Sequence, residues 1–329
     1  MSTRYGQIQI ANSEPFSRHL NGFGSSPYLQ EKLVFPGQLE TYDQAARVAQ
    51  TLMGLPIASS QIYRLTNHYG AAIDDELDQP GASEQPPADG VVDVQADGAM
   101  ILTDDGYKEN KLSRIFKATA LKQSPVAHRG GPIESSLFTA HLGNAAEFTA
   151  KCRPHLDPLG TDLVLSVTGR SGFRTDAHPL PQATLILDSR PLMNCVGNVG
   201  VAAYRRAAGR SRWLEHQRSF LLASKIDEVL GHIKAARIRA TLRDSVCGYV
   251  EANRDRMDYA RYQRRGLLIG SGAIESAHRT VVQKRLKRSG QRWSMAGAQH
   301  VLNLRTCWMS QRWELVREHI EPVNYAMAV

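Results

Sequence analysis

The sequence has 329 residues, of which 42% are hydrophobic and 22% are charged, a balance that excludes collagen-like, coiled-coil and wholly disordered chains. The 40 Lys and Arg exceed the 32 Asp and Glu, which gives a formal net charge of +8. Residues 1–105 hold 14 acidic and 5 basic residues, a net of −9, which leaves +17 for the rest. This division predicts that one part of the protein meets a polyanion, with nucleic acid as the expected partner.

Cysteine spacing and hydropathy predict the compartment. Cys152, Cys195, Cys247 and Cys307 have no short spacing, so neither a zinc site nor a disulfide framework is expected. No apolar run approaches the roughly 18 residues that a membrane span needs. The first residues also lack an apolar core of signal-peptide length. We therefore expect a cytoplasmic protein with no membrane partner.

Three helices are predicted after a polar, Gly- and Ser-rich segment, residues 1–26, that we expect to be flexible. They cover Tyr28–Phe35, Thr41–Leu55 and about Ser59–Tyr69. The short turn at Gly54 between the second and third helices favours a helix-turn-helix domain over residues 27–73. A plain helical hairpin is the alternative, because Arg47 and Arg64 are the only basic residues in these two helices.

Residues 74–90, DDELDQPGASEQPPADG, are acidic and rich in Pro and Gly, which predicts a linker. After it, VVDVQADGAMIL predicts a strand and Asp105-Gly106 a hairpin turn. Four more strands are predicted at Tyr107–Ser113, Arg114–Leu121, TDLVLSV (161–167) and ATLIL (183–187). Helices are predicted at Glu134–Arg153, throughout 199–266, and from about Ala273 to Ile320 with a break near Ser289-Gly290.

This order predicts a mixed α/β domain with a helical insertion and a helical end. Its first part would span residues 91–198, the insertion 199–266, and the C-terminal part with a basic helix 267–329.

Three acidic residues lie where strands or loops meet helices. Asp97 follows VVDVQA, Asp188 ends the strand ATLIL, and Glu275 begins a helix within IGSGAIES. Carboxylates gathered in this way can hold two Mg²⁺ ions, which stabilise the attacking and leaving oxygens of a phosphodiester. Taken singly, each is also explained as a turn Asp or as a Glu favoured by the dipole at a helix N-terminus.

The helix that follows Glu275 is strongly basic. It carries Arg279, Lys284, Arg285, Lys287 and Arg288, with Arg292 just beyond. Between residues 267 and 317 there are 9 basic and 2 acidic residues. Such a run is often a solvated face, but its place beside a candidate carboxylate predicts a phosphate backbone laid across a metal site. Five lone histidines, His128, His141, His178, His278 and His300, show no ligand spacing.

The segment IGSGAIESAHRTVVQKRLKRSGQRWS resembles the C-terminal signature of bacterial insertion-sequence transposases of the Mutator-like DDE superfamily, ISKra type. Other segments agree in order: SPYLQEKLVFPGQLETYDQAARVAQTLMGLPIASSQIYRLTNHYG, VQADGAMILTDDGYKENKL, QATLILD and YARYQRRGLLIGSG. The resemblance covers most of residues 27–315. It implies an RNase H-like mixed sheet with a helical insertion, preceded by a small all-α helix-turn-helix domain.

The resemblance also implies a function. Asp97 would be the first catalytic carboxylate and Glu275 the last, and both would hold Mg²⁺ or Mn²⁺. Asp188 is a further catalytic candidate, and Arg64 with the basic helix would hold DNA. The implied reaction is nicking of DNA at element ends, followed by attack of the freed 3′-OH on target DNA. The expected partners are double-stranded DNA and further copies of the chain, in the nucleoid of a bacterial cytoplasm.

The middle of the chain departs from the family pattern. The family has its second catalytic Asp after the strand that TDLVLSV matches, in a motif close to Asp-Gly-Ala-x-Trp-Ile, but this chain reads VTGRSGF at 167–173. Suitable codons for these residues read as Asp-Gly-Ala-Leu-Trp-Ile in another frame, which predicts a frame-disrupted transposase copy whose frame resumes near Gln182. Asp162 and Asp176 are candidate substitutes. The family's Asp-x-x-His signature is also incomplete, because Asp188 is followed by Ser189, Arg190 and Pro191.

Two functions from different classes follow. The first is a DDE-type DNA transposase, impaired if the second Asp is lost, and the alternative is a non-catalytic DNA-binding protein derived from one. A hydrolase with a carboxylate pair for small molecules is a third, less favoured by the basic helix. The nucleotide sequence of the gene across residues 160–200 tests the frame disruption directly.

Overall fold

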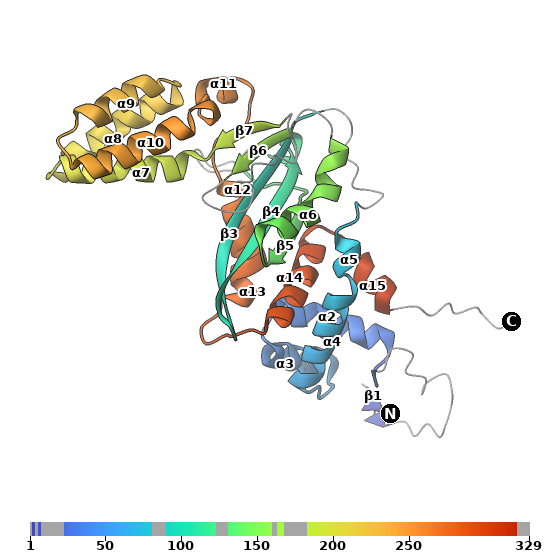
Figure 1. Ribbon diagram of the computed structural model, residues 1–329. Helices are drawn as coiled ribbons and strands as arrows, with labels where there is room; N and C mark the ends of the chain where they lie inside the picture. Colours follow the sequence, from blue (N-terminus) through green and yellow to red (C-terminus); the bar gives the residue numbers. More distant parts are fainter. Residues whose placement is uncertain are drawn as a thin grey trace.

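A computed structural model describes residues 2–3, 6–7, 23–80, 90–122, 131–159, 163–167 and 183–320. The protein is a mixed α/β chain in three parts: a cluster of N-terminal helices, a central sheet, and a helical bundle that projects from one end of the sheet (Figure 1). Among the described residues, no helix is both long and apolar enough to cross a membrane. The segment predicted to be flexible, 1–26, lies mostly outside the described residues; β1 (Ser2–Thr3) and β2 (Gly6–Gln7) within it pair antiparallel.

The three predicted N-terminal helices are confirmed. They are α2 (Pro27–Leu39), α3 (Tyr42–Met53) and α4 (Ser59–Ala72). Thr41 caps α3 through its side chain, and Gly54 ends it with φ of 68°, a left-handed conformation that favours glycine. These helices share a core with the C-terminal helices, because Leu65 and Tyr69 belong to the same buried cluster as Leu304.

The first part of the predicted acidic linker is ordered. Residues 74–77 form a short helix, α5 (Asp74–Leu77). Lys151 explains this order, because its ammonium lies 3.2 Å from the Asp74 carboxylate and 3.0 Å from that of Asp78. Burial raises the pKa of Asp78, and the pairing with Lys151 opposes part of that shift. Residues 81–89 of the predicted linker lie outside the described part of the chain.

The central sheet has five strands in the order β5-β4-β3-β6-β7. Their bounds are β3 (Val92–Thr103), β4 (Gly106–Lys117), β5 (Leu137–Leu142), β6 (Leu163–Val167) and β7 (Thr184–Leu187). The first three form an antiparallel meander, and β6 and β7 run parallel to β3. The hairpin turn lies at Asp104 and Asp105, one residue before its predicted place, and Gly106 follows it with φ of 86°.

Two predicted elements are wrong in this region. The strands expected at 107–113 and 114–121 are one continuous strand, β4, because every residue from Gly106 to Lys117 pairs with β3. The helix expected over 134–153 is a strand, β5, followed by α6 (Ala145–Leu156). The spacing of the apolar residues in β5 is compatible with a helix and with a strand, and the hydrogen bonds to β4 select the strand. Asn144 then caps α6 by accepting from the Glu147 backbone N–H at 2.9 Å.

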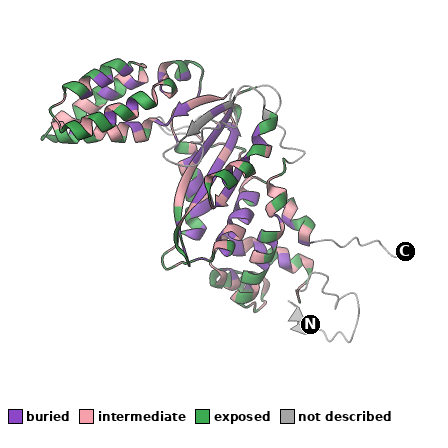
Figure 2. Ribbon diagram, in the orientation of Figure 1, coloured by how far each residue is buried: buried purple, intermediate pink, exposed green. Residues whose placement is uncertain are grey.

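Each face of the sheet is covered by helices (Figures 1 and 2). Val92, Val94 and Ala96 of β3 pack with Phe148 and Cys152 of α6 on one face. The other face is covered by α12 (Gly272–Ala277), the π-helical turn η4 (His278–Gln283), α13 (Lys284–Leu286) and α14 (Met295–Met309), with α15 (Glu314–Ile320) beyond them. The predicted break before α14 is confirmed, since the chain leaves helical geometry at residues 287–294.

The helical insertion begins at residue 189, ten residues earlier than predicted. It contains α7 (Ser189–Ala203), α8 (Ala207–Leu222), α9 (Ile226–Ala235), α10 (Ala240–Ala252) and α11 (Tyr259–Arg264). The first four form an up-and-down bundle that closes through contacts between α7 and α10. Asp188 caps α7, so the insertion starts directly at the end of β7. Short 3-10 turns lie at Ala118–Ala120, Asp157–Leu159 and Arg254–Arg256.

Candidate functional site

The parallel pairing of β3, β6 and β7 ends at one common row of residues, and two of the predicted acidic residues, Asp97 and Asp188, lie just beyond it. We call this place, with Glu275 above it, the carboxylate edge. Ala96 pairs with Val167, and Val167 pairs with Leu187, so β3, β6 and β7 are in register at their last paired row. Asp97 and Asp188 each come one residue after that row. Two strand spacings therefore separate them, roughly 10 Å between backbones. Thr168, which follows Val167 in the sequence, lies outside the described residues, as do Asp162 and Asp176.

Asp97 and Asp188 differ in exposure and in partners. Asp97 is half-buried, and its Oδ1 accepts a hydrogen bond from the Gly98 backbone N–H at 2.8 Å. Asp188 is buried, and its Oδ1 accepts from the Arg190 backbone N–H at 3.0 Å as the N-cap of α7. The turn-and-cap alternative stated for Asp188 therefore has direct structural support.

Glu275 is brought to the same face of the sheet by α12. Gln95, two residues before Asp97 on β3, accepts from the Ile274 backbone N–H at 3.1 Å and donates to the Gly270 carbonyl at 3.4 Å. Arg114 on β4 donates to the Ala273 carbonyl at 3.1 Å. Burial lowers the pKa of this guanidinium to about 10. These two side chains fix the first turn of α12 over β3, and the sequence patterns did not single out either one.

The Glu275 carboxylate is held by neighbours on both oxygens. Its Oε1 accepts from the Ser271 hydroxyl at 2.9 Å, and its Oε2 forms an ion pair with Arg190. Arg190 stands two residues after Asp188, at the start of α7. A guanidinium thus neutralises the carboxylate that the resemblance makes a metal ligand.

The described residues do not by themselves form a metal site. No group of three or more His, Cys, Asp or Glu side chains suited to a metal ion occurs among them. Magnesium takes near-octahedral oxygen coordination, usually from one or two carboxylates together with water or phosphate oxygens, and the Glu275 carboxylate already pairs with a cation. Asp97 and Glu275 lie on the same face without completing the predicted Mg²⁺ set.

We expect Arg190→Ala to strengthen binding of Mn²⁺, because it frees the Glu275 carboxylate. Stability should change little, since exposed ion pairs contribute about 0–1 kcal/mol, or a few degrees in melting temperature at most. Calorimetric titration with Mn²⁺ measures the first effect and thermal unfolding the second. Arg292→Ala is the matched control, because Arg292 forms an equally exposed ion pair with Asp104 at 3.0 Å. Equal Mn²⁺ affinity in the two variants would contradict the expectation.

The sequence patterns did not predict that two ionisable residues, His278 and Asp93, are buried. His278, three residues after Glu275, is buried, and burial lowers its pKa while the charge of Asp97 opposes part of the shift. Asp93 is 1% exposed in the middle of the sheet, and neither of its carboxylate oxygens has a hydrogen-bond partner among the described residues. Burial raises the pKa of Asp93 to about 7.

The predicted DNA-binding residues divide into two groups. Arg279, Lys284 and Lys287 are exposed, as is Arg64 on α4. The other three residues, Arg285, Arg288 and Arg292, make contacts within the protein. Arg285 is 1% exposed and donates to the Gly37 carbonyl, so its assignment to the DNA-binding surface is wrong for this conformation. Its guanidinium also lies 4.8 Å from the ring centres of Tyr42 and Trp293.

Arg288 and Arg292 form ion pairs. Arg288 lies 2.7 Å from the Glu40 carboxylate, and Arg292 lies 3.0 Å from that of Asp104. The basic run is therefore only partly a free surface. It also joins the N-terminal helices and the β3–β4 hairpin to the C-terminal helix.

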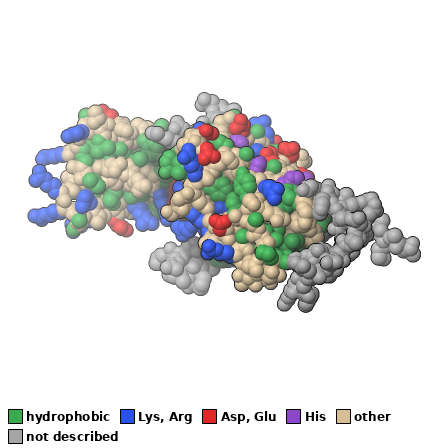
Figure 3. Space-filling view, turned by 90° about the horizontal axis from the view of Figure 1, so that it is seen from below, with side chains coloured by type: hydrophobic (Ala, Val, Ile, Leu, Met, Phe, Trp, Pro, Cys, Tyr) green, Lys and Arg blue, Asp and Glu red, His purple; other side chains and the backbone are tan. Residues whose placement is uncertain are grey.

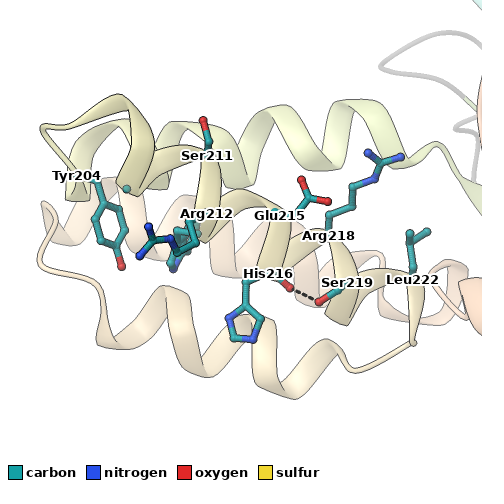
Figure 4. A pocket seen from close by; sticks show the side chains of 10 residues that line it. Tyr204, Ser211, Arg212, Glu215, His216, Arg218, Ser219 and Leu222 are labelled. Carbon is teal, nitrogen blue, oxygen red and sulfur yellow. Dashed lines mark hydrogen bonds between the residues drawn. The ribbon is translucent and has the colours of Figure 1, made fainter.

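One large groove lies away from the carboxylates, along α8 in the insertion. It measures about 1060 Å³ and is lined by Tyr204, Arg212, Trp213 and His216, among others. Figure 4 shows Ser211, Glu215 and Arg218 on one side of α8, opposite Arg212 and His216, as on an exposed helix. The four grooves with lining residues in the described part of the chain are lined by neither Asp97 nor Glu275.

A comparison of the chain with known protein families finds no match, and a comparison with curated proteins finds none either.

Proposed function

We propose that this chain is a DNA-binding protein with the architecture of a DDE-type transposase. The observation that carries the proposal is the common row at which the parallel pairing of β3, β6 and β7 ends. Asp97 and Asp188 lie one residue beyond the last paired row, and α12 carries Glu275 over the same sheet. An antiparallel meander whose first strand, β3, also pairs with β6, which in turn runs parallel to β7, supports the RNase H-like core that the resemblance implies.

The N-terminal helices support a contact with duplex DNA. Helices α3 and α4 are joined through a five-residue turn, and Arg47 and Arg64 are exposed on them. A helix-turn-helix places such side chains against phosphates and base edges. Arg279, Lys284 and Lys287 add exposed positive charge on the helix beside Glu275.

Strand cleavage is the part of the proposed function that the carboxylates limit. A two-metal mechanism needs ligands for both ions, and the described residues supply an incomplete set in which Arg190 pairs with Glu275. We therefore propose that this chain keeps its affinity for duplex DNA but has little or no cleavage activity. The ion pair at Glu275 favours the second candidate, a non-catalytic DNA-binding protein of transposase descent that acts as a homo-oligomer on DNA.

The decisive experiment measures binding and nicking on one substrate, an element-end duplex taken from the inverted repeats that flank the gene. The duplex is incubated with the chain with and without Mg²⁺. The transposase would be established if the unaltered chain cleaves the duplex with Mg²⁺ and if Asp97→Asn and Glu275→Gln each abolish that cleavage. Asp105→Asn in the hairpin turn is the control and should leave cleavage intact. Binding without cleavage in any variant would establish the non-catalytic protein. Absence of binding at low salt would overturn both.

A further inference from the structure

The outer end of the helical insertion concentrates positive charge. Residues 201–212, at the turn from α7 to α8, and residues 234–243, at the turn from α9 to α10, hold eight Lys and Arg and no Asp or Glu. We call these two segments the insertion tip. They lie side by side, because Ala202 at the end of α7 lines one groove with Arg237, Arg239 and Leu242. Figure 3 shows Lys and Arg side chains gathered at this end of the bundle.

Four arginines of the insertion tip are free to meet a partner, whereas Arg243 at its border lies 3.3 Å from the Asp244 carboxylate. Arg205, Arg206, Arg237 and Arg239 are exposed, and none of them forms an ion pair with a carboxylate of the described residues. Arg254 nearer the sheet differs, since it lies 2.8 Å from the Asp227 carboxylate and 3.0 Å from that of Glu251. Unpaired cations held close together repel one another, so a polyanion that binds there gains more than it would at a paired site.

The first turn of the insertion tip is held in place by its own packing. Tyr204 donates its backbone N–H to the Gly200 carbonyl at 3.0 Å, and its ring lies 6.1 Å from that of Trp213. A Cβ at Gly200 would approach the Trp213 ring to 3.2 Å, so glycine allows α7 and α8 to pack this closely. Arg205 and Arg206 therefore project from a supported turn, which lowers the entropy lost when they bind.

Distance links the insertion tip to the carboxylate edge. Helix α7 begins at its cap Asp188 and has 15 residues, which corresponds to a length of about 22 Å. A duplex advances about 3.4 Å per base pair, so the same span covers roughly six or seven base pairs. The two sites thus lie within one turn of a duplex.

We propose that the insertion tip binds the phosphate backbone of the same duplex that meets the carboxylate edge, about six base pairs away. This inference rests on the proposed function and adds a second contact to it. Phosphates are favoured over base edges as the ligand, because the tip offers several arginines on two short turns rather than one helix face that could enter a groove. The tip therefore contributes affinity and register without sequence preference.

The test compares two variants that each remove two positive charges. Arg237→Gln/Arg239→Gln changes the insertion tip. Arg153→Gln/Lys122→Gln is the control, because Arg153 lies on α6, which covers the face of the sheet away from α12. Affinity for the element-end duplex is measured against salt concentration, and the contact length by hydroxyl-radical footprinting. Thermal unfolding of both variants shows that the fold is kept.

We expect the tip variant to lower the slope of log affinity against log salt by up to about 2, near 0.9 per lost phosphate contact. Its footprint should shorten at one end by about six base pairs, while the control keeps both the slope and the footprint. Equal slopes and footprints in the two variants would overturn the inference and leave the proposed function standing. No duplex binding by the unaltered chain would overturn both. Loss of binding to vesicles of anionic phospholipid, with duplex binding kept, would assign the tip to a membrane surface instead.

Discussion

Arg305→Met is expected to lower the free energy of unfolding by about 3 kcal/mol, because it leaves several buried carbonyls without donors. Arg305 on α14 is 4% exposed. Its guanidinium donates to the carbonyls of Thr280 and Val281 in the π-helical turn η4, and to the Gln38 carbonyl at 2.9 Å. One side chain thus joins α14, η4 and α2. Met keeps much of the volume and the apolar contacts, so the loss reports the hydrogen bonds.

The size of this effect reflects two opposing contributions. Each buried acceptor left unpaired costs about 1–3 kcal/mol, whereas removal of a buried charge recovers part of that cost. Burial lowers the pKa of Arg305 to about 10, which shows that its charge is desolvated. Urea unfolding measures the difference. Arg279→Met is the control, since Arg279 lies in the same turn but is exposed, and equal losses in the two variants would refute the assignment.

Asp93→Asn is expected to stabilise the protein above neutral pH. The pKa of Asp93 is raised to about 7 in the folded chain because the carboxyl is buried in the sheet and has no hydrogen-bond partner among the residues that the structure describes, whereas in the unfolded chain it is about 3.9. The folded state then binds more protons than the unfolded state between these two values. Stability from this group is therefore full below pH 4, declines as the pH rises to 7, and stays low above that.

A shift of about three units corresponds to about 4 kcal/mol, the most that Asp93→Asn should gain at pH 8. At pH 5 the gain should be about 2–3 kcal/mol smaller, because the buried carboxyl is already protonated there. Urea unfolding at both pH values measures the two gains. Asp105→Asn in the exposed hairpin turn is the control and should show no such pH dependence. A gain that is equal at pH 5 and pH 8 would show that Asp93 is not the titrating group.

Local patterns were sufficient where one period dominates. Helix α3 has apolar positions at helical spacing, a capping Thr41 and a terminating Gly54, and its predicted bounds differ from the observed ones by one or two residues. Strand β5 was missed because Leu137, Ala140 and Leu142 also fit a helix. Only its pairing with β4, more than twenty residues earlier in the chain, distinguishes the two.

The candidate site shows the same limit. Asp97 and Glu275 were predicted from their places at a strand and at a helix start. Gln95 and Arg114 could not be predicted as the residues that hold α12, since they bond to a segment about 160–180 residues away. The burial of Asp93 likewise depends on both neighbouring strands, β4 and β6, which flank it in the sheet.

The acidic and basic regions of the sequence are partly brought into contact in the folded protein. Glu40 and Asp104 belong to the acidic first third, and they pair with Arg288 and Arg292 of the basic last third. Part of the acidic charge of the first third and part of the basic charge of the last third therefore neutralise each other in ion pairs. The insertion tip, which has no acidic residue within its two segments, keeps its positive charge.

Helix α7 joins the helical bundle to the sheet at Asp188, so a small rotation there would move the outer end of the bundle by a larger distance. A rotation of 10° about its first turn would displace the outer end by about 4 Å, given its length of about 22 Å, which exceeds one base-pair step. Conversely, a partner that fixes the outer end fixes the direction in which α7 leaves the sheet. Arg190 lies in that first turn, so the same rotation changes its reach toward Glu275. A partner bound at the outer end of the bundle would therefore also bear on the ion pair between Arg190 and Glu275.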